Sequence, residues 1–302
     1  LRTLPADDGF EIEEWASLGQ SAVPAGTDLL VIAGPTANFV PPEADAIAAY
    51  LEGGGRLLAM IDPLLPRSGT SFVATGLEET FAKYGVRLGN DLVVDPANPL
   101  PMFGAETLFA NSYGQHPIVE PLERQNLPIL INLSRSVQKS ESAASDVVEL
   151  FRTSVEGWGE TDLAAATKVT KDPSDTAGPV VLGVAVGGPP PAPPPSEVPT
   201  VDPNVPKAEE RKARLVVLGD SDFATNQFWN ANVGNSTLVA DAVNWLVDRS
   251  TLIAIAPKST EQTKLNLTSG QMRNVYLLVL AVLPSLVVAL GLWMYLSRRK
   301  RA

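Results

Sequence analysis

The sequence predicts an α/β fold in which a mostly parallel sheet has flanking helices, followed by one C-terminal transmembrane helix. Three observations support this prediction. A strand, a helix and a second strand follow one another between Asp28 and Asp62. A later apolar run, Leu215–Leu218, ends at a glycine, as a buried strand would. Finally, Val275–Leu296 contains no charged residue.

The first strand, helix and second strand are the clearest fold signal. Leu29–Ala33 is an apolar run too short for a helix and suited to a strand buried on both faces. Pro42 suits the first turn of the following helix, and Gly53–Gly55 ends that helix. Apolar residues recur along one side of it at Ala44, Ile47, Ala48 and Leu51. Arg56–Ile61 is the second strand, so the order predicts a βαβ unit with a right-handed crossover.

Shorter elements follow along the chain. Thr75–Glu78 has the spacing of a capping box and opens a short helix. Further apolar runs predict strands at Asp91–Pro96, Ile129–Leu133, Val147–Phe151, Val180–Val186 and Leu215–Leu218. Asn235 can cap a helix whose apolar stripe includes Val239 and Leu246, and Leu252–Ile255 predicts a last strand. Residues 97–115 show no clear periodicity.

Composition and charge exclude several functions. The 302 residues are 45% hydrophobic, enough for one large or two modest cores. The formal charge is −11, or about −15 without the four C-terminal cations, which argues against nucleic acid as a partner. The chain has no cysteine, which excludes thiol nucleophiles and cysteine-ligated metals. Its only histidine is His116, which excludes multi-histidine metal sites, and no cofactor is expected. Gly53–Gly55 closes a helix instead of opening one, and no P-loop motif occurs, so nucleotide binding is not predicted.

The apolar segment near the C-terminus predicts a membrane anchor. Roughly 22 residues at about 1.5 Å each span the ~30 Å hydrocarbon layer. Basic residues follow this segment, whereas only Arg273 lies close before it, so the C-terminus is expected in the cytoplasm and residues 1–274 outside, on the inner membrane. The anchoring residues are then Tyr276, Trp293, Tyr295, Arg298, Arg299, Lys300 and Arg301. The first residues, LRTLPADDGFEIEEW, lack the basic start and the apolar stretch of a signal peptide, so an export segment is expected upstream.

Four parts of the chain are expected from these patterns. They are an extracytoplasmic α/β domain at 1–256, a polar tether at 257–274, the transmembrane helix at 275–296 and a basic cytoplasmic tail at 297–302. Within the domain, residues 187–212 are expected to form a proline-rich disordered insertion, because proline cannot donate to a sheet and favours extended structure.

Candidate ligand-binding residues follow from the predicted strand ends. Open α/β sheets bind ligands at the carboxyl ends of their strands. This rule selects Asn38, Asp62, Asp220 and Asp222. Three carboxylates could hold a divalent cation, but the simpler interpretation is that each caps a turn or helix, and no metal site is predicted.

Ser221 offers an alternative, enzymatic function. Gly219–Ser221 resembles the nucleophile block of SGNH-type esterases, in which a strand-end serine attacks an ester. Such a serine needs a base, usually a histidine. No histidine follows Ser221, and His116 precedes it without the expected aspartate three residues upstream. An envelope esterase therefore remains the alternative to a protein without catalytic function.

Several stretches in a fixed order resemble the GldG-type auxiliary component of ABC transport systems, first associated with gliding motility. They are DLLVIAGP, AYLEGGGRLLAMIDP, YGQHPIV, LFRTSVEGW, RLVVLGDSDFATN and NWLVD, followed by the C-terminal span ending in RRKR. Two features depart from the family: the expected upstream membrane segment is missing, and the proline-rich insertion is longer.

The resemblance implies an extracytoplasmic domain related to the class I glutamine amidotransferase-like, or Rossmann-like, fold. It implies a place beside an ABC permease and, through the permease, a separate cytoplasmic ATPase. The resemblance implies no catalytic residue in this chain, so the fold would act as a scaffold through protein–protein contacts. Membrane lipid is the other expected partner. Whether the chain forms a homo- or hetero-oligomer is left open.

Overall fold

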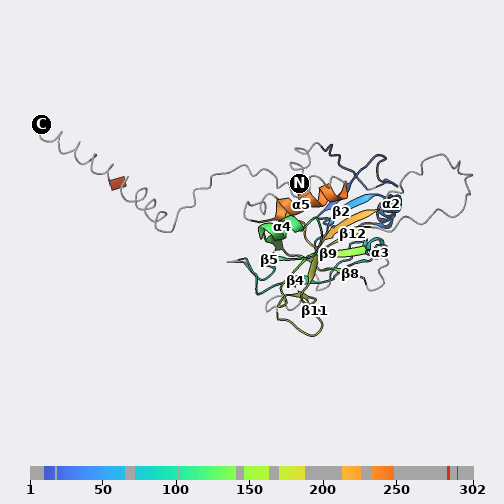
Figure 1. Cartoon of the computed structure of the whole chain (residues 1–302). Coiled ribbons are helices and arrows are strands. Elements are labelled where there is room, and N and C mark those ends of the chain that lie inside the picture. Colours follow the sequence, from blue (N-terminus) through green and yellow to red (C-terminus); the bar gives the residue numbers. More distant parts are fainter. Residues whose placement is uncertain are drawn as a thin grey trace, which may run out of the picture. The chain divides into compact units, whose positions relative to one another are not determined.

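A computed structural model describes residues 10–17, 19–64, 72–100, 103–140, 146–162, 170–187, 213–225 and 233–247, together with residues 284, 285 and 291. The chain separates into two compact units, Leu1–Pro257 and Lys258–Ala302. All the helices and strands named below belong to the first unit, which Figure 1 shows with its labelled elements.

A six-stranded mixed sheet is the centre of this unit. Its order is β1 (Leu30–Ala33), β2 (Arg56–Met60), β13 (Arg214–Leu218), β12 (Val181–Gly187), β9 (Asp146–Arg152) and β6 (Ser112–Tyr113). The strands β1, β2 and β13 are parallel, whereas β12, β9 and β6 each pair antiparallel with the strand before them in this order.

The predicted fold class, a mostly parallel sheet with flanking helices, is therefore wrong, because the main sheet is mixed. The strand predicted at Val180–Val186 is present as β12, which is buried along nearly its whole length. Burial on both faces does not fix strand direction, however. Strands β12 and β13 are neighbours in antiparallel orientation, with Val184 opposite Val217.

The βαβ unit predicted at the start of the chain is confirmed. Strands β1 and β2 run parallel, with Leu30 opposite Leu57, and α2 (Pro41–Glu52) connects them. Proline is tolerated at the helix start because the first N–H groups have no partner within the helix. The carboxylate of Glu43 accepts a hydrogen bond from the Val40 N–H at 3.0 Å, which satisfies one donor at this end.

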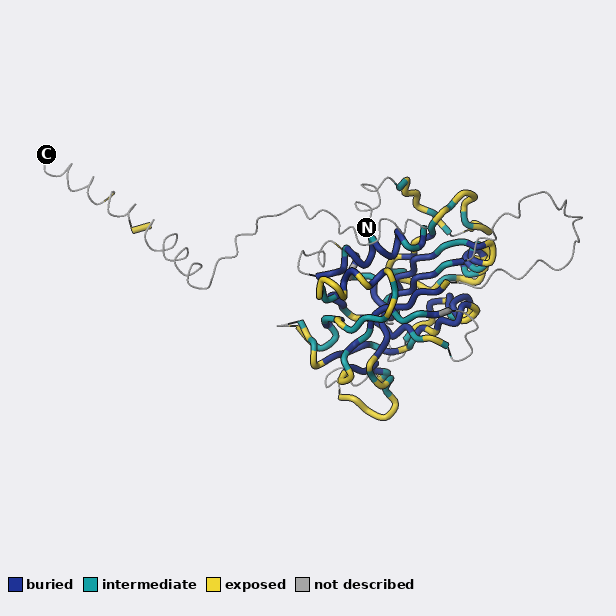
Figure 2. Tube along the Cα trace, in the orientation of Figure 1, coloured by how far each residue is buried: buried dark blue, intermediate teal, exposed yellow. Residues whose placement is uncertain are grey.

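Helices cover both faces of the parallel strands. On one face, Leu58 and Met60 of β2 belong to the same core as Leu238 and Ala242 of α5 (Asn235–Leu246). On the other face, Leu57 and Ala59 belong to the core that contains residues of α2 and of α3 (Glu78–Lys83). Adjacent residues of β2 thus point to opposite faces, and Figure 2 shows the buried sheet between exposed outer segments.

Three small antiparallel sheets form the rest of the unit. Their strand orders are β11–β10–β4, β3–β8 and β5–β7. The bounds are β3 Val86–Leu88, β4 Leu92–Val94, β5 Thr107–Ala110, β7 Ile129–Asn132, β8 Val137–Lys139, β10 Trp158–Glu160 and β11 Thr176–Ala177. A short helix α4 (Glu120–Gln125) precedes β7, and a 3-10 turn η2 (Asp222–Ala224) follows β13.

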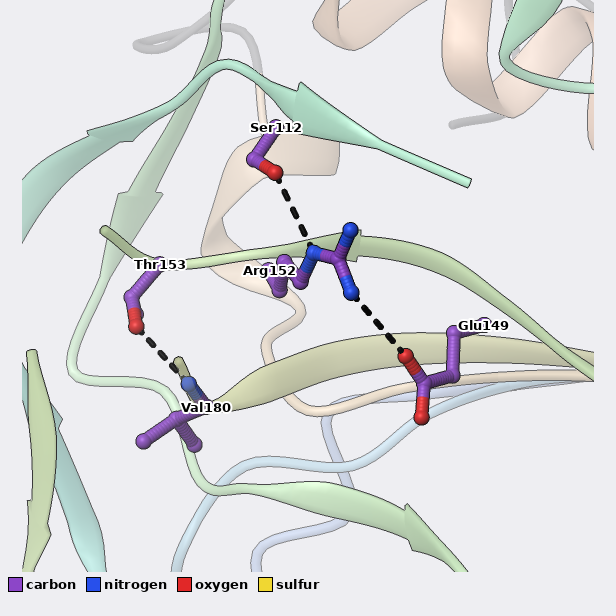
Figure 3. A network of polar contacts seen from close by, with 5 residues as sticks. All are labelled: Ser112, Glu149, Arg152, Thr153 and Val180. Carbon is purple, nitrogen blue, oxygen red and sulfur yellow. Dashed lines mark hydrogen bonds and ion pairs between the residues drawn. The ribbon is translucent and has the colours of Figure 1, made fainter. Parts of the chain in front are cut away.

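Polar contacts at the β6 edge hold two strands of the main sheet together (Figure 3). The guanidinium of Arg152 donates to the Ser112 hydroxyl at 3.2 Å and pairs with the Glu149 carboxylate at 3.6 Å. One residue further on, the Thr153 hydroxyl accepts a hydrogen bond from the Val180 N–H at 2.9 Å. These contacts join β9 to β6 and to the backbone just before β12, so they fix the end of β9.

Several predictions fall outside the described residues. These are the last strand at 252–255, most of the proline-rich insertion, the tether, the basic tail and all seven predicted anchoring residues. Of the predicted transmembrane helix, only residues 284, 285 and 291 are described. Within the described part of the chain, no helix has both the length and the apolar character needed to cross a membrane.

Candidate functional site

Two predicted residues, Asp62 and Asp220, follow the carboxyl ends of the adjacent parallel strands β2 and β13. The Asp62 carboxylate accepts hydrogen bonds from the Ser221 N–H and the Ser221 hydroxyl, both at 2.6 Å. Burial raises the pKa of the Asp62 carboxyl, and the two bonds from Ser221 oppose that shift. The loop after β13 is thereby tied to the end of β2.

Asp220 is the most deeply buried carboxylate of the predicted set, with 1% of its surface exposed. Its two oxygens accept hydrogen bonds from two backbone donors, the Asn132 N–H at 2.8 Å and the Asp222 N–H at 2.7 Å. Burial raises the pKa of Asp220 well above its usual value, and the nearby Asp62 and Asp222 carboxylates raise it further. Asp220 therefore organises two backbone segments around itself.

Asn132 joins this cluster from the end of β7 and was not among the predicted site residues. Its side-chain amide donates to the Asp222 carboxylate at 2.8 Å, and its side-chain oxygen accepts from the Thr107 hydroxyl at 2.8 Å. Asn132 ends an apolar strand, so the rule that selected the strand-end aspartates could also have found it. Its contact with Asp220, in the loop after β13, spans 88 residues of sequence, so no local pattern reveals it.

Gly34 brings the end of β1 against the same loop. It has a φ of +61°, a conformation that side chains rarely adopt. A Cβ atom at this position would lie 2.5 Å from the Ser221 hydroxyl oxygen and 3.3 Å from an Asp62 carboxylate oxygen. Glycine is therefore required for the close approach of β1 to Ser221.

Arg135 is a buried cation beneath the cluster that sequence reasoning missed. Its backbone N–H donates to the Gly219 carbonyl at 2.8 Å, and its guanidinium donates to the carbonyl of Gly89 and the side-chain oxygen of Asn90. Burial lowers the pKa of Arg135, and the charge of Asp62 is among those that oppose this shift. The cation offsets part of the negative charge at the sheet edge.

Asn38 does not join these residues. Its side chain is exposed in the loop between β1 and α2, and no hydrogen bond within the described ranges links it to the carboxylates. The part of the chain that the structure describes also contains no group of three or more histidine, cysteine or acidic side chains arranged to hold a metal ion. The carboxylates of Asp62 and Asp220 instead accept hydrogen bonds from the protein itself.

Ser221 and His116 make separate contacts. The Ser221 hydroxyl binds Asp62, whereas the His116 ring packs edge-on against Trp245 at 4.9 Å and accepts a hydrogen bond from the Ile118 N–H at 3.3 Å. Burial lowers the pKa of His116 to about 4, so the ring is neutral at physiological pH. These contacts assemble no serine–histidine pair, which is the arrangement that the esterase interpretation requires.

Comparison with known proteins identifies the class of protein to which this chain belongs. It is a class of transport proteins, since the family model described as "ABC-type uncharacterized transport system" matches residues 4–242. The chain belongs to this family of ABC transport auxiliary components, as its resemblance to the GldG-type component predicted.

Solved structures add only a distant likeness. One of the matching chains, described as "mmIFT52 N-terminal domain", is 15% identical, with 74% of this chain and 78% of that chain covered at a TM-score of 0.48. No curated protein matches the chain.

Proposed function

We propose that this protein is a non-catalytic, membrane-anchored auxiliary subunit of an ABC-type transporter, whose folded domain acts by contact with the permease. The observation that supports this proposal most is the family match across residues 4–242, which includes the whole of the six-stranded sheet. A permease and, through it, a cytoplasmic ATPase are the expected partners.

The chemistry of the sheet edge supports a scaffold. In an enzyme of this architecture, reactive groups at the strand ends would be free to meet substrate. Here the Asp62 carboxylate is engaged by Ser221, and the Asp220 carboxylate is engaged by two backbone N–H groups. These bonds hold together the end of β7 and the loops that follow β2 and β13. The Ser221 hydroxyl therefore donates its hydrogen bond to a carboxylate and not to a histidine.

Membrane anchoring rests on the sequence of the second unit. Residues 275–296 carry no charge and are followed by four cations at 298–301, so we place the C-terminus in the cytoplasm and the folded unit outside the cytoplasmic membrane. Protease added to membrane vesicles of known orientation should digest the folded unit only from the extracytoplasmic side. Digestion from the cytoplasmic side would contradict this placement.

Copurification tests the proposed function itself. The full chain, extracted from native membranes in mild detergent, should bring down an ABC permease and its ATPase in a fixed ratio. The full chain carries an affinity tag in this experiment, and the control is the same extraction from cells that do not produce the tagged chain. Purification of the chain alone, with ester hydrolysis that disappears in Ser221→Ala, would instead establish the esterase.

A further inference from the structure

Three large apolar side chains are exposed on three loops of the part of the unit that contains the small sheets. Phe103 is 62% exposed, Leu133 is 40% exposed and Val155 is 76% exposed. Phe103 precedes β5, Leu133 follows β7, and Val155 lies between β9 and β10. Figure 1 shows β4, β5 and β11 together beside the six-stranded sheet, and Figure 2 shows exposed segments along this part.

Hydrogen bonds hold the three loops next to one another. The Leu133 N–H donates to the Glu106 carbonyl at 3.1 Å, which joins the Leu133 loop to the Phe103 loop. The Asp95 N–H donates to the Ala105 carbonyl at 2.9 Å, while the Asp95 carboxylate accepts from the Ser154 N–H at 2.8 Å and the Ser154 hydroxyl at 2.7 Å. Buried Asp95 thus connects the Phe103 loop to the Val155 loop.

Leu133 is held in an unfavourable backbone conformation. Its φ is +52°, in the left-handed region where glycine and asparagine are common and leucine is not. The residues on both sides are fixed, since Asn132 binds Asp220 and Asp222, and Arg135 binds the Gly219 carbonyl. A strained, exposed leucine contributes little to the core, so its presence calls for a role at the surface.

Acidic groups lie beside the apolar ones. The Glu106 carboxylate lies over Gly104, the neighbour of Phe103, and Glu156 is exposed next to Val155. The chain as a whole has a formal charge of −11 despite its four C-terminal cations. A negative rim repels anionic lipid headgroups and attracts lysine and arginine side chains.

We propose that Phe103, Leu133 and Val155, with Glu106 and Glu156 at their rim, form the surface through which this protein binds its transporter partner. The partner is a protein that presents apolar side chains flanked by lysine or arginine. This inference rests on the proposed function, because it assigns the permease contact to one surface. Exposed apolar side chains that enter a partner's pockets supply affinity, and the acidic rim supplies orientation and partner choice.

Photocrosslinking in cells tests this surface directly. A photoreactive phenylalanine analogue at Phe103 of the full chain should crosslink to the permease, whereas the same analogue at Val31 should not. Val31 is the matched control because it is also exposed, at 40%, but lies on β1 in the main sheet. Crosslinking from Phe103 only to a second copy of this chain or to lipid would overturn the proposal.

Substitution gives an independent measurement. The triple variant Phe103→Ser, Leu133→Gly, Val155→Ser should lower the copurified permease by about tenfold or more, whereas Val31→Ser should not. Glu106→Lys and Glu156→Lys together should also weaken recovery, because they reverse the rim charge. Leu133→Gly alone should leave the melting temperature unchanged or raised, since glycine accepts the positive φ.

The outcomes separate this proposal from the proposed function. If the wild type brings down the permease and the triple variant brings down as much, the surface is refuted while the subunit function stands. If the wild type brings down no permease, both are refuted. If the triple variant loses the permease but also melts at a much lower temperature, the single variant Leu133→Gly decides. Less copurified permease at an unchanged melting temperature supports the proposed surface. Copurification of as much permease as with the wild type overturns it.

Discussion

Asp220→Ala should destabilise the protein strongly, because the buried carboxylate accepts hydrogen bonds from two backbone donors, the Asn132 and Asp222 N–H groups. Each buried donor left without a partner costs about 1–3 kcal/mol. The variant also avoids the free-energy cost of burying a carboxylate, which offsets part of this loss. The free energy of unfolding should therefore fall by about 2–4 kcal/mol. Urea unfolding of residues 1–257, the first compact unit, measures the change.

The pH dependence of that cost follows from the raised pKa of Asp220 in the folded protein. A raised folded pKa means that the folded state binds the proton more tightly than the unfolded state. The stabilisation is complete below the unfolded pKa of about 3.9 and is lost as the pH rises toward the folded value. Since alanine cannot titrate, the difference between wild type and Asp220→Ala should be largest at acidic pH and should shrink as the pH rises.

Asp222→Ala is the matched control. Asp222 is only partly buried, and its carboxylate accepts a hydrogen bond from the Asn132 side-chain amide, so this change should cost no more than about 1 kcal/mol. Equal losses in the two variants would refute the role assigned to Asp220. Stabilisation of the wild type by millimolar calcium or magnesium that disappears in Asp222→Asn would show that the carboxylates hold a cation after all.

Other predictions use the same unfolding measurements. Burial lowers the pKa of His116 to about 4, below its unfolded value of about 6.5, so stability should fall by up to about 3 kcal/mol as the pH drops between these values. The variant His116→Phe should remove that part of the pH dependence, and an unchanged pH dependence would contradict the prediction. Gly219→Ala should cost about 1–3 kcal/mol, because a Cβ atom there would collide with the Arg135 carbonyl oxygen; a neutral result would mean that the two loops move apart easily. Shortening 189–206 to a glycine–serine linker should shift the melting temperature by no more than a few degrees, because this sequence is poor in large apolar side chains; a large drop would show that it packs against the domain.

Local pattern was enough for most of the individual elements. The apolar runs at Arg56–Ile61, Val180–Val186 and Leu215–Leu218 form β2, β12 and β13, and the helical repeat after Pro42 forms α2. Each of these elements is specified by the periodicity of its own residues, and both parallel strands of the βαβ unit are close in sequence. Residues 97–115 show the limit of this approach, because β5 and β6 are there without a periodic pattern.

Strand direction and sheet order depended on contacts that local pattern does not contain. An apolar run looks the same in a parallel and in an antiparallel strand when both of its faces are buried. The pairing of β12 with β9 and β13, both antiparallel, therefore could not be distinguished from a parallel arrangement by periodicity. This ambiguity is why the mostly parallel sheet was predicted wrongly.

The sequence by itself determined the family, through stretches in a fixed order along the chain. It also determined the βαβ unit and the strand-end positions of Asp62 and Asp220, because these depend on residues close together in the chain. Only the tertiary structure decided what those carboxylates bind. Asp62 binds a serine 159 residues away, and Asp220 binds the backbone of Asn132, 88 residues away. The buried Arg135 and the strained Leu133 belong to the same long-range arrangement, since their roles come from neighbours that only folding brings near.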